Sequence, residues 1–275
     1  IHGDVFYYKE TDSYFKAVAK SKRPLYKQAI DDDTLYFSAD TLINANPSDS
    51  LNYMEAIRYV RIFKSNLQAV CDSLYYSDLD STFHLIGNPI VWSDTIQFTG
   101  DTIKLVMKND EISEIIASQN AFIISNEIED YYNQIKARYL HAYLDSNTLT
   151  KMELRGNAES LYLIKDGNDE YIGPNHTLCS EMDFHFADDD LSDIRYYTEP
   201  ESNLVPMGQA GESDLRRANF KWYVKERPLN WRMVLEVTRS VQKRSTEKEE
   251  MDKFEREVDE LMKRGERPDK KSRKR

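Results

Sequence analysis

The chain has 275 residues and a net charge of -11, from 48 acidic and 37 basic side chains. This acidic balance argues against a nucleic-acid-binding protein, because affinity for phosphate backbones comes mainly from clustered lysines and arginines. No stretch reaches the roughly 20 apolar residues that cross a bilayer, which predicts a soluble chain, and 18 tyrosines and 11 phenylalanines favour β-sheet.

A four-residue phrase recurs along the chain: a small residue, Asp, a hydroxyl residue and an aliphatic residue. Its clear copies are residues 39–42 (ADTL), 71–74 (CDSL) and 100–103 (GDTI), and weaker copies begin at Gly3, Ala137 and Cys179. The copies start about 29 to 42 residues apart, which is typical of stacked structural repeats. Their fourth position is apolar in all six, so each copy predicts the start of a strand with one apolar face.

A second phrase, ending in Asn, follows three of these copies at Gly87-Asn88, Gln119-Asn120 and Gly156-Asn157. Apolar residues alternate five and three positions before each Asn, and two and four positions after it in the first two copies. Because Gly and Asn tolerate positive φ, we expect the step to bend one strand from one sheet into the next. A plain surface turn is the alternative, and in the first repeat Lys22-Arg23 takes the place of Gly-Asn.

Helix is expected in two places. Residues 48–57 (SDSLNYMEAI) predict a short helix inserted in the second repeat. After Trp231, the strand-like residues Met233, Leu235 and Val237 give way to a charged segment, where Thr246 and Glu249 resemble a capping box. An apolar stripe at helical spacing follows, made by Met251, Phe254, Val258, Leu261 and Met262. We therefore predict a β-domain over residues 1–240 and, over 241–275, an amphipathic helix with a basic disordered end.

No constellation for catalysis stands out. The five histidines fall on unrelated segments, and there is no GxSxG, P-loop or GxGxxG motif, so no catalytic residue, cofactor or metal is predicted. Asp183 with Asp188 to Asp190 offers oxygen ligands for calcium, but a solvated turn is the favoured interpretation. Cys71 and Cys179 occupy equivalent small-residue positions, and we expect both thiols to be free.

The predicted fold class is all-β: an elongated, two-layered stack of antiparallel strands, each apolar on one side. Two such layers either close on each other as a dry core or splay and hold something apolar between them. Residue types alone leave both alternatives open.

The repeated phrases support a family resemblance. Residues 71–92 (CDSLYYSDLDSTFHLIGNPIVW), 100–125 (GDTIKLVMKNDEISEIIASQNAFIIS) and 137–163 (ARYLHAYLDSNTLTKMELRGNAESLYL) resemble the OstA-like, or LptA-like, proteins of lipopolysaccharide export, in particular the large Bacteroidetes-type versions. The resemblance covers about residues 1 to 210. Lys22-Arg23, Gln119, the insertion near residues 47–57 and the charged tail depart from the pattern.

This resemblance implies a folded-over antiparallel sheet, a β-jellyroll or β-taco, in the periplasm or associated with the outer membrane. It implies no enzymatic activity, an interior that shields lipid A acyl chains, and edge strands that join other OstA-like domains. The charged helix is expected to cover the end of the stack or to bind a protein partner. Carried onto this chain, the lipid-binding positions are Leu74, Tyr76, Phe83, Leu85, Ile90, Trp92, Ile103, Leu105, Ile115, Phe122, Ile124, Leu140, Met152, Leu154 and Leu161.

Two other functions remain as alternatives. The first is an envelope scaffold with a dry core, which assembles partners through its edge strands and the C-terminal helix. The second is a carbohydrate-active solenoid, against which we note the lack of paired acidic residues at repeated trough positions. Because the chain begins at Ile1 rather than Met, we expect it to be a processed or excised piece.

Overall fold

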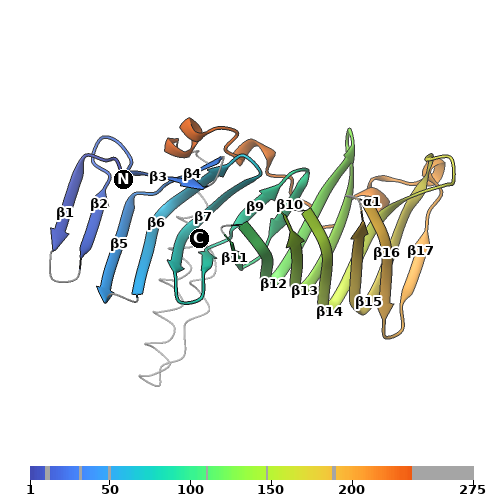
Figure 1. Cartoon of the computed structure of the whole chain (residues 1–275). Helices are drawn as coiled ribbons and strands as arrows, with labels where there is room; N and C mark the ends of the chain where they lie inside the picture. The colour runs from blue at the N-terminus through green and yellow to red at the C-terminus, as the bar shows by residue number, and fades with distance from the viewer. Residues whose placement is uncertain are drawn as a thin grey trace, which may run out of the picture. The chain divides into compact units, whose positions relative to one another are not determined.

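The computed structural model describes residues 1–9, 13–30, 33–48, 51–109, 111–146, 148–187 and 190–236. These residues belong to one unit, Ile1–Glu236, in which seventeen strands join in a single continuous sheet with antiparallel pairing (Figure 1). The predicted all-β stack is therefore confirmed. The strands are β1 (Val5–Lys9), β2 (Tyr14–Val18), β3 (Leu25–Ile30), β4 (Asp33–Ser38), β5 (Thr41–Ser48), β6 (Leu51–Lys64), β7 (Leu67–Ser77), β8 (Thr82–Ile86), β9 (Ile90–Ser93), β10 (Ile96–Thr99), β11 (Thr102–Lys108), β12 (Glu111–Ile128), β13 (Tyr131–Asp145), β14 (Thr148–Lys165), β15 (Tyr171–Ala187), β16 (Asp190–Tyr197) and β17 (Glu201–Leu204).

The sheet folds over into two layers because its long strands bend in the middle. We call the layers A and B. Layer A contains β1, β2, β5, β8, β11 and β16, and layer B contains β3, β4, β9, β10 and β17. Strands β6, β7, β12, β13, β14 and β15 run through both layers, one half in each.

The bends coincide with pairs of consecutive residues at positive φ. Gly87-Asn88, Gln119-Asn120 and Gly156-Asn157 all have φ between 51° and 85°, so the predicted bend at the Asn phrase is confirmed. At Gly156 only glycine fits without strain, since φ is +85° and a Cβ would meet the Cβ of Arg138 at 3.0 Å. Two further pairs, Arg58-Tyr59 and Thr198-Glu199, show the same geometry without the sequence signature.

The four-residue phrase packs against these bends. The backbone N–H groups of Asp40, Asp72 and Asp101 donate to the carbonyls of Arg58, Gly87 and Gln119 at 3.1, 3.3 and 3.0 Å. The small residue before each Asp lies at the junction of the layers, where Ala39 and Cys71 are 0% and 4% exposed. Both cysteines occupy this position and are free thiols, Cys71 buried and Cys179 half-buried.

Two local predictions are wrong. Residues 48–57 do not form a helix: β5 reaches Ser48 and β6 starts at Leu51, because strands pair with β6 on both sides and Met54 and Ala56 alternate into the core. Met233 and Leu235 belong to a 3-10 helix, η4 (Trp231–Leu235), rather than a strand. The predicted helix and tail over 241–275 lie outside the described residues.

One large apolar cluster occupies most of the space between the layers. It contains the inward-facing residues of both layers, among them Phe37, Leu42, Leu85, Ile115 and Phe184, all at most 1% exposed. Burial of this area is the main favourable term for folding.

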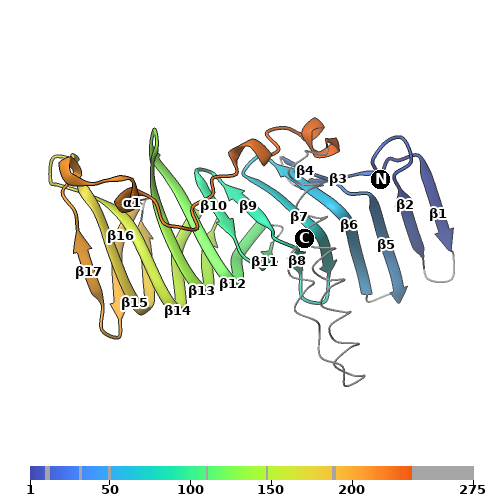
Figure 2. The same cartoon turned by 180° about the vertical axis from the view of Figure 1, so that it is seen from behind.

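A C-terminal strap, residues 205–236, crosses the outer face of layer B. It carries η2 (Met207–Gln209), α1 (Glu212–Leu215), η3 (Val224–Glu226) and η4, and both views show it running back across the strands from β17 toward β4 (Figures 1 and 2). Every helix among the described residues is too short or too polar to cross a lipid bilayer.

A row of buried polar side chains holds the strap. Gln134 binds the carbonyl of Leu215 and the N–H of Arg217, and Gln97 binds the carbonyl of Lys221 and the N–H of Tyr223, at 2.8 to 2.9 Å. Further contacts of this kind join Gln68 to Arg227, Arg61 to Met233 and Glu226, and Arg23 to Val234. Because Gln68, Gln97, Gln134 and Arg61 are at most 3% exposed, the strap belongs to the folded unit.

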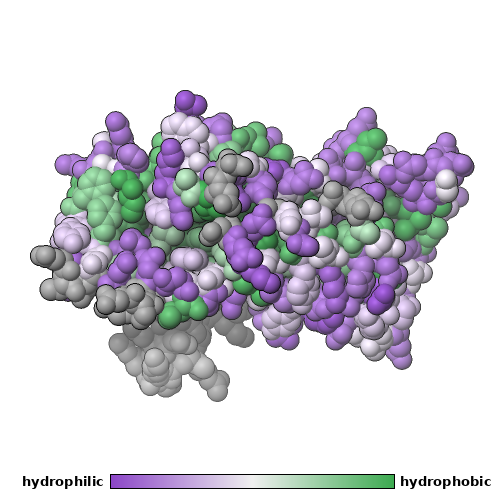
Figure 3. Space-filling view, in the orientation of Figure 1, coloured by the Kyte–Doolittle hydropathy of each residue, from purple (hydrophilic) through white to green (hydrophobic). Residues whose placement is uncertain are grey.

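The two ends of the sheet differ in chemistry. At one end β1 pairs with β2 alone among the described strands, and Phe6, Tyr7 and Tyr8 are 45%, 57% and 69% exposed. The surface at this end shows a hydrophobic patch (Figure 3). At the other end β16 and β17 expose mainly polar and charged side chains.

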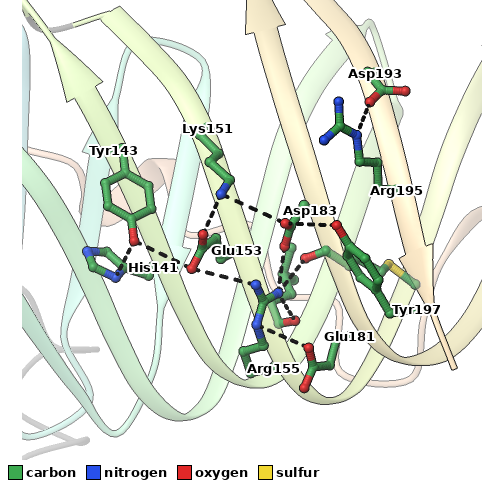
Figure 4. A network of polar contacts seen from close by, with 12 residues as sticks. His141, Tyr143, Lys151, Glu153, Arg155, Glu181, Asp183, Asp193, Arg195 and Tyr197 are labelled. Atoms are coloured by element: carbon green, nitrogen blue, oxygen red, sulfur yellow. Dashed lines mark hydrogen bonds and ion pairs between the residues drawn. The ribbon is translucent and has the colours of Figure 1, made fainter.

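The outer face of layer A carries a charged network across β12 to β16 (Figure 4). Its centre is Asp183, which is 6% exposed, accepts from Arg155 at 2.6 Å and from the Tyr197 hydroxyl at 3.3 Å, and lies 3.8 Å from Lys151. Lys151 also pairs with Glu153. His141 continues the network toward Glu114 at 2.6 Å.

Candidate functional site

A cavity of about 210 Å³ lies between the layers in the N-terminal half of the unit. Its lining comes from both layers and lies toward the strand ends at Ile30, Lys64 and Asp78, away from the bends. The inner faces of the strands build its walls, because alternate residues of a strand point to the same side. Layer A contributes Met54, Leu74, Tyr76, Phe83, Leu105, Met107 and Ile112, and layer B contributes Tyr26, Ile30, Leu35, Phe37, Ile62 and Leu67.

Polar side chains also border this cavity: Gln28, Asn44, Asn52, Lys64 and Asp78. Most of them are satisfied by neighbours. The Asn44 amide donates to Asn52 at 2.9 Å, Asp78 accepts from the Asn52 N–H at 2.9 Å, and the Tyr26 hydroxyl donates to Gln28 at 2.8 Å.

Burial raises the pKa of Tyr26 above its ordinary value of 10.0, with a smaller contribution from Tyr76. The hydroxyl of Tyr26 therefore keeps its proton and adds no charge to the cavity wall. Aromatic contacts fix the walls, with Tyr26 stacked on Phe37 at 4.5 Å and Tyr76 against Phe83 at 4.4 Å between ring centres. The arrangement is an apolar slot with a polar border, which suits an aliphatic chain attached to a polar group.

Ten of the fifteen predicted lipid-binding positions face the interior. Leu74, Leu85, Ile103, Leu105, Ile115, Leu140, Met152 and Leu154 belong to the buried interlayer cluster, and Tyr76 and Phe83 pack against it. Four of the ten line the cavity: Leu74, Tyr76, Phe83 and Leu105. The other six are at most 3% exposed and fill closed parts of the interior.

The other five lie on the opposite face of layer B, so they are not part of a common trough. Ile90 and Trp92 form a separate cluster with Val70 and Tyr223, and Phe122 and Ile124 form another with Tyr132, Phe220 and Trp222. Leu161 stands opposite Gln134, whose amide binds the strap. All five are covered by the strap or lie in the row beneath it.

The error has a simple geometric cause. The alternation of inward residues continues unbroken through the bend, so the inward positions after Asn120 are Ala121 and Ile123, one and three residues on. The outward positions, Phe122 and Ile124, are also apolar because the strap buries them. Both faces of layer B are therefore apolar here, and apolar character alone does not tell which face points inward.

Several lining residues escaped the sequence-based prediction. Leu35 and Phe37 on β4 and Ile62 and Leu67 at the β6–β7 turn form the layer B wall. The alternation of Leu35 and Phe37 in DTLYFS is a usable signal, but no Gly-Asn phrase marks this repeat. Within the described ranges, no group of three or more His, Cys, Asp or Glu side chains is placed to hold a metal ion.

Comparison with known proteins gives a likeness to solved structures and none to sequences. No family model and no curated protein sequence matches the chain. Among solved structures, the chain is similar to LptH of Pseudomonas aeruginosa, described as the LptA-homologous periplasmic component of the lipopolysaccharide transport device. The identity is 12% and the TM-score 0.40, over 52% of this chain and 99% of that chain.

Proposed function

We propose that this protein is a non-enzymatic, periplasmic component of lipopolysaccharide transport that shelters an acyl chain between its two layers. The observation that carries the proposal is the apolar cavity between layers A and B, walled by Tyr76, Phe83 and Leu105 on one side and Leu35 and Phe37 on the other. Its polar border leaves room for a headgroup outside the apolar space.

The energetics suit a carrier. Each CH₂ group that leaves water contributes about 0.8 kcal/mol, so a short apolar slot favours an acyl chain without any specific chemistry. At about 210 Å³ the slot is smaller than the roughly 300 to 1,000 Å³ of ordinary ligand pockets. It therefore takes part of a chain, and deeper insertion requires the layers to separate.

The ends of the sheet extend the proposal to protein partners. An unpaired edge strand accepts a strand from another chain. Because β1 has one neighbour among the described strands and exposes aromatic side chains, we propose that similar domains of an export machine pair with such edges. The predicted C-terminal helix remains a candidate site for a further protein partner.

An envelope scaffold without lipid is the second candidate function. It is favoured by the tight packing of the C-terminal half, where Leu140, Leu154 and Phe184 are at most 1% exposed between the layers. In that case the edges alone carry the function, and the cavity is a packing defect.

Site-specific photo-crosslinking separates the two candidates. A benzophenone amino acid replaces Tyr76 or Phe83, which line the cavity, in the full chain incubated with lipopolysaccharide and illuminated. We expect a lipopolysaccharide adduct at both positions, detected by immunoblot and mass spectrometry.

Matched controls lie on the same strands. Tyr75 and His84 are the adjacent residues on β7 and β8, stand opposite each other on the outer face of layer A, and carry the probe outside the cavity. Equal labelling at Tyr75 and Tyr76, or no labelling at Tyr76 and Phe83, would contradict lipid binding between the layers and favour the scaffold.

A further inference from the structure

A second concavity follows the bends of β12 to β15 on the solvent side of the fold. Its volume is about 680 Å³, and three of the positive-φ pairs border it: Gln119-Asn120, Gly156-Asn157 and Thr198-Glu199. Its floor is a row of residues that stand opposite one another on layer B, namely Lys136, Glu159, Leu178 and Glu201. We call this concavity the bend groove.

The bend groove gathers polar groups that have no partner of their own. Among the described residues, the side chains of Lys136, Asn157, Ser180, Glu199 and Glu201 form no hydrogen bond or ion pair, although all five line the groove. Because all five line one concavity, their free donors and acceptors form a surface available to a ligand.

The remaining lining residues set limits on the ligand. Glu159 is occupied by Arg217 and His176, and Arg138 lies over the Tyr139 ring, 5.4 Å from its centre. With Glu159 paired to Arg217, the carboxylates of Glu199 and Glu201 balance the cations Lys136 and Arg138, and this near-zero charge gives no preference for an anionic ligand such as a phosphate. Leu178, 42% exposed, adds an apolar contact in the floor.

From this chemistry we propose that the bend groove binds an uncharged oligosaccharide. Sugar hydroxyl groups each donate and accept, which matches the mixture of ammonium, amide, hydroxyl and carboxylate groups. The apolar C–H faces of sugar rings can pack against the side chain of Leu178. The size of the groove fits several sugar units, within the range of ordinary ligand pockets.

The bend groove is independent of the lipid proposal. The interlayer cavity is lined by inner-face residues of β3 to β12, and the two linings share no residue. Failure of crosslinking at Tyr76 therefore leaves the oligosaccharide proposal untouched, and the reverse also holds.

Calorimetric titration of the full chain with maltohexaose and chitohexaose, two uncharged hexasaccharides, tests the proposal. The anionic hexagalacturonate serves as the counter-probe. We expect binding of at least one uncharged probe and a loss of about tenfold or more in affinity in the triple variant Lys136→Ala, Ser180→Ala, Glu201→Ala, because several hydrogen bonds disappear together.

The control variant Lys104→Ala, Glu170→Ala removes one exposed cation and one exposed carboxylate away from the groove and keeps the wild-type affinity. The triple variant changes exposed or half-buried side chains without partners, so its thermal unfolding stays close to wild type. The proposal is overturned if neither uncharged probe binds, if hexagalacturonate binds more tightly, or if the triple variant binds as well as the control.

Discussion

The outer faces of layers A and B are made by the same long strands and meet at the same bends, yet they carry opposite chemistry. On layer B a cross-strand row reads Gln68, Trp92, Gln97, Ile124, Gln134 and Leu161, all buried beneath the strap. The corresponding row on layer A reads Tyr75, His84, Lys104, Ile116, His141, Glu153 and Asp183, and within the described chain no segment covers it.

The difference shows what a covering segment demands of a sheet. Apolar side chains supply buried area, and the glutamines between them satisfy strap backbone groups that water no longer reaches. An uncovered face instead carries charged pairs, each worth little in water. On this sheet, apolar side chains fill a face wherever a second layer or the chain itself lies on it, and glutamines there bind the backbone of the strap.

Among these predictions, removal of the Trp92 side chain should cause the largest loss of stability. The side chain is 0% exposed and packs with Val70, Ile90 and Tyr223, so Trp92→Ala is expected to lower the free energy of unfolding by about 3 to 5 kcal/mol. Urea denaturation measures it. The matched change on layer A, Tyr75→Ala at a residue that is 36% exposed, should cost about 1 kcal/mol or less. Similar losses for both variants would show that the strap adds no burial.

An intermediate effect is expected at Gln97, which holds the strap without adding apolar area. In Gln97→Ala the carbonyl of Lys221 and the N–H of Tyr223 lose their partner, which should cost about 1 to 3 kcal/mol. Hydrogen exchange of the Tyr223 amide should accelerate more than exchange in β12 or β13. If the Tyr223 amide exchanges as in the wild type, Gln97 does not fix the strap. Lys104→Ala, at an exposed position on layer A, is the control.

The smallest effect concerns the charged network of layer A and depends on pH. The hydrogen bond from Lys151, reinforced by charge, lowers the pKa of Glu153 below its ordinary value of 4.5. A carboxylate with a lowered pKa stabilises the fold fully above the ordinary value and loses this stabilisation as the pH falls through the lowered one. Lys151→Ala should therefore slightly reduce the free energy of unfolding at pH 7. The further loss of stability as the pH falls below 4.5 should be smaller in the variant than in the wild type. If the variant and the wild type lose stability equally as the pH falls below 4.5, Lys151 is not the group that lowers the pKa of Glu153.

The sequence determined the strands, the bends and most of the interior. The spacing of the four-residue phrase and the Asn phrase located the bends at residues 87–88, 119–120 and 156–157, because positive φ at consecutive residues favours Gly and Asn. Period-two alternation assigned Leu85, Ile115 and Leu154 to the interior, since a strand has only two sides. The bends and the alternation are local properties, and each depends on only a few consecutive residues.

Only the tertiary structure decided what covers each face. Strand pairing on both sides overrode the helix expected at residues 48–57, and bends at Arg58-Tyr59 and Thr198-Glu199 formed without Gly or Asn. Trp92 and Phe122 look like interior residues in the sequence, but they lie under a strap that follows them by about 100 residues or more. Apolar residues record that a position is buried and not which segment buries it, since the hydrophobic effect has no direction.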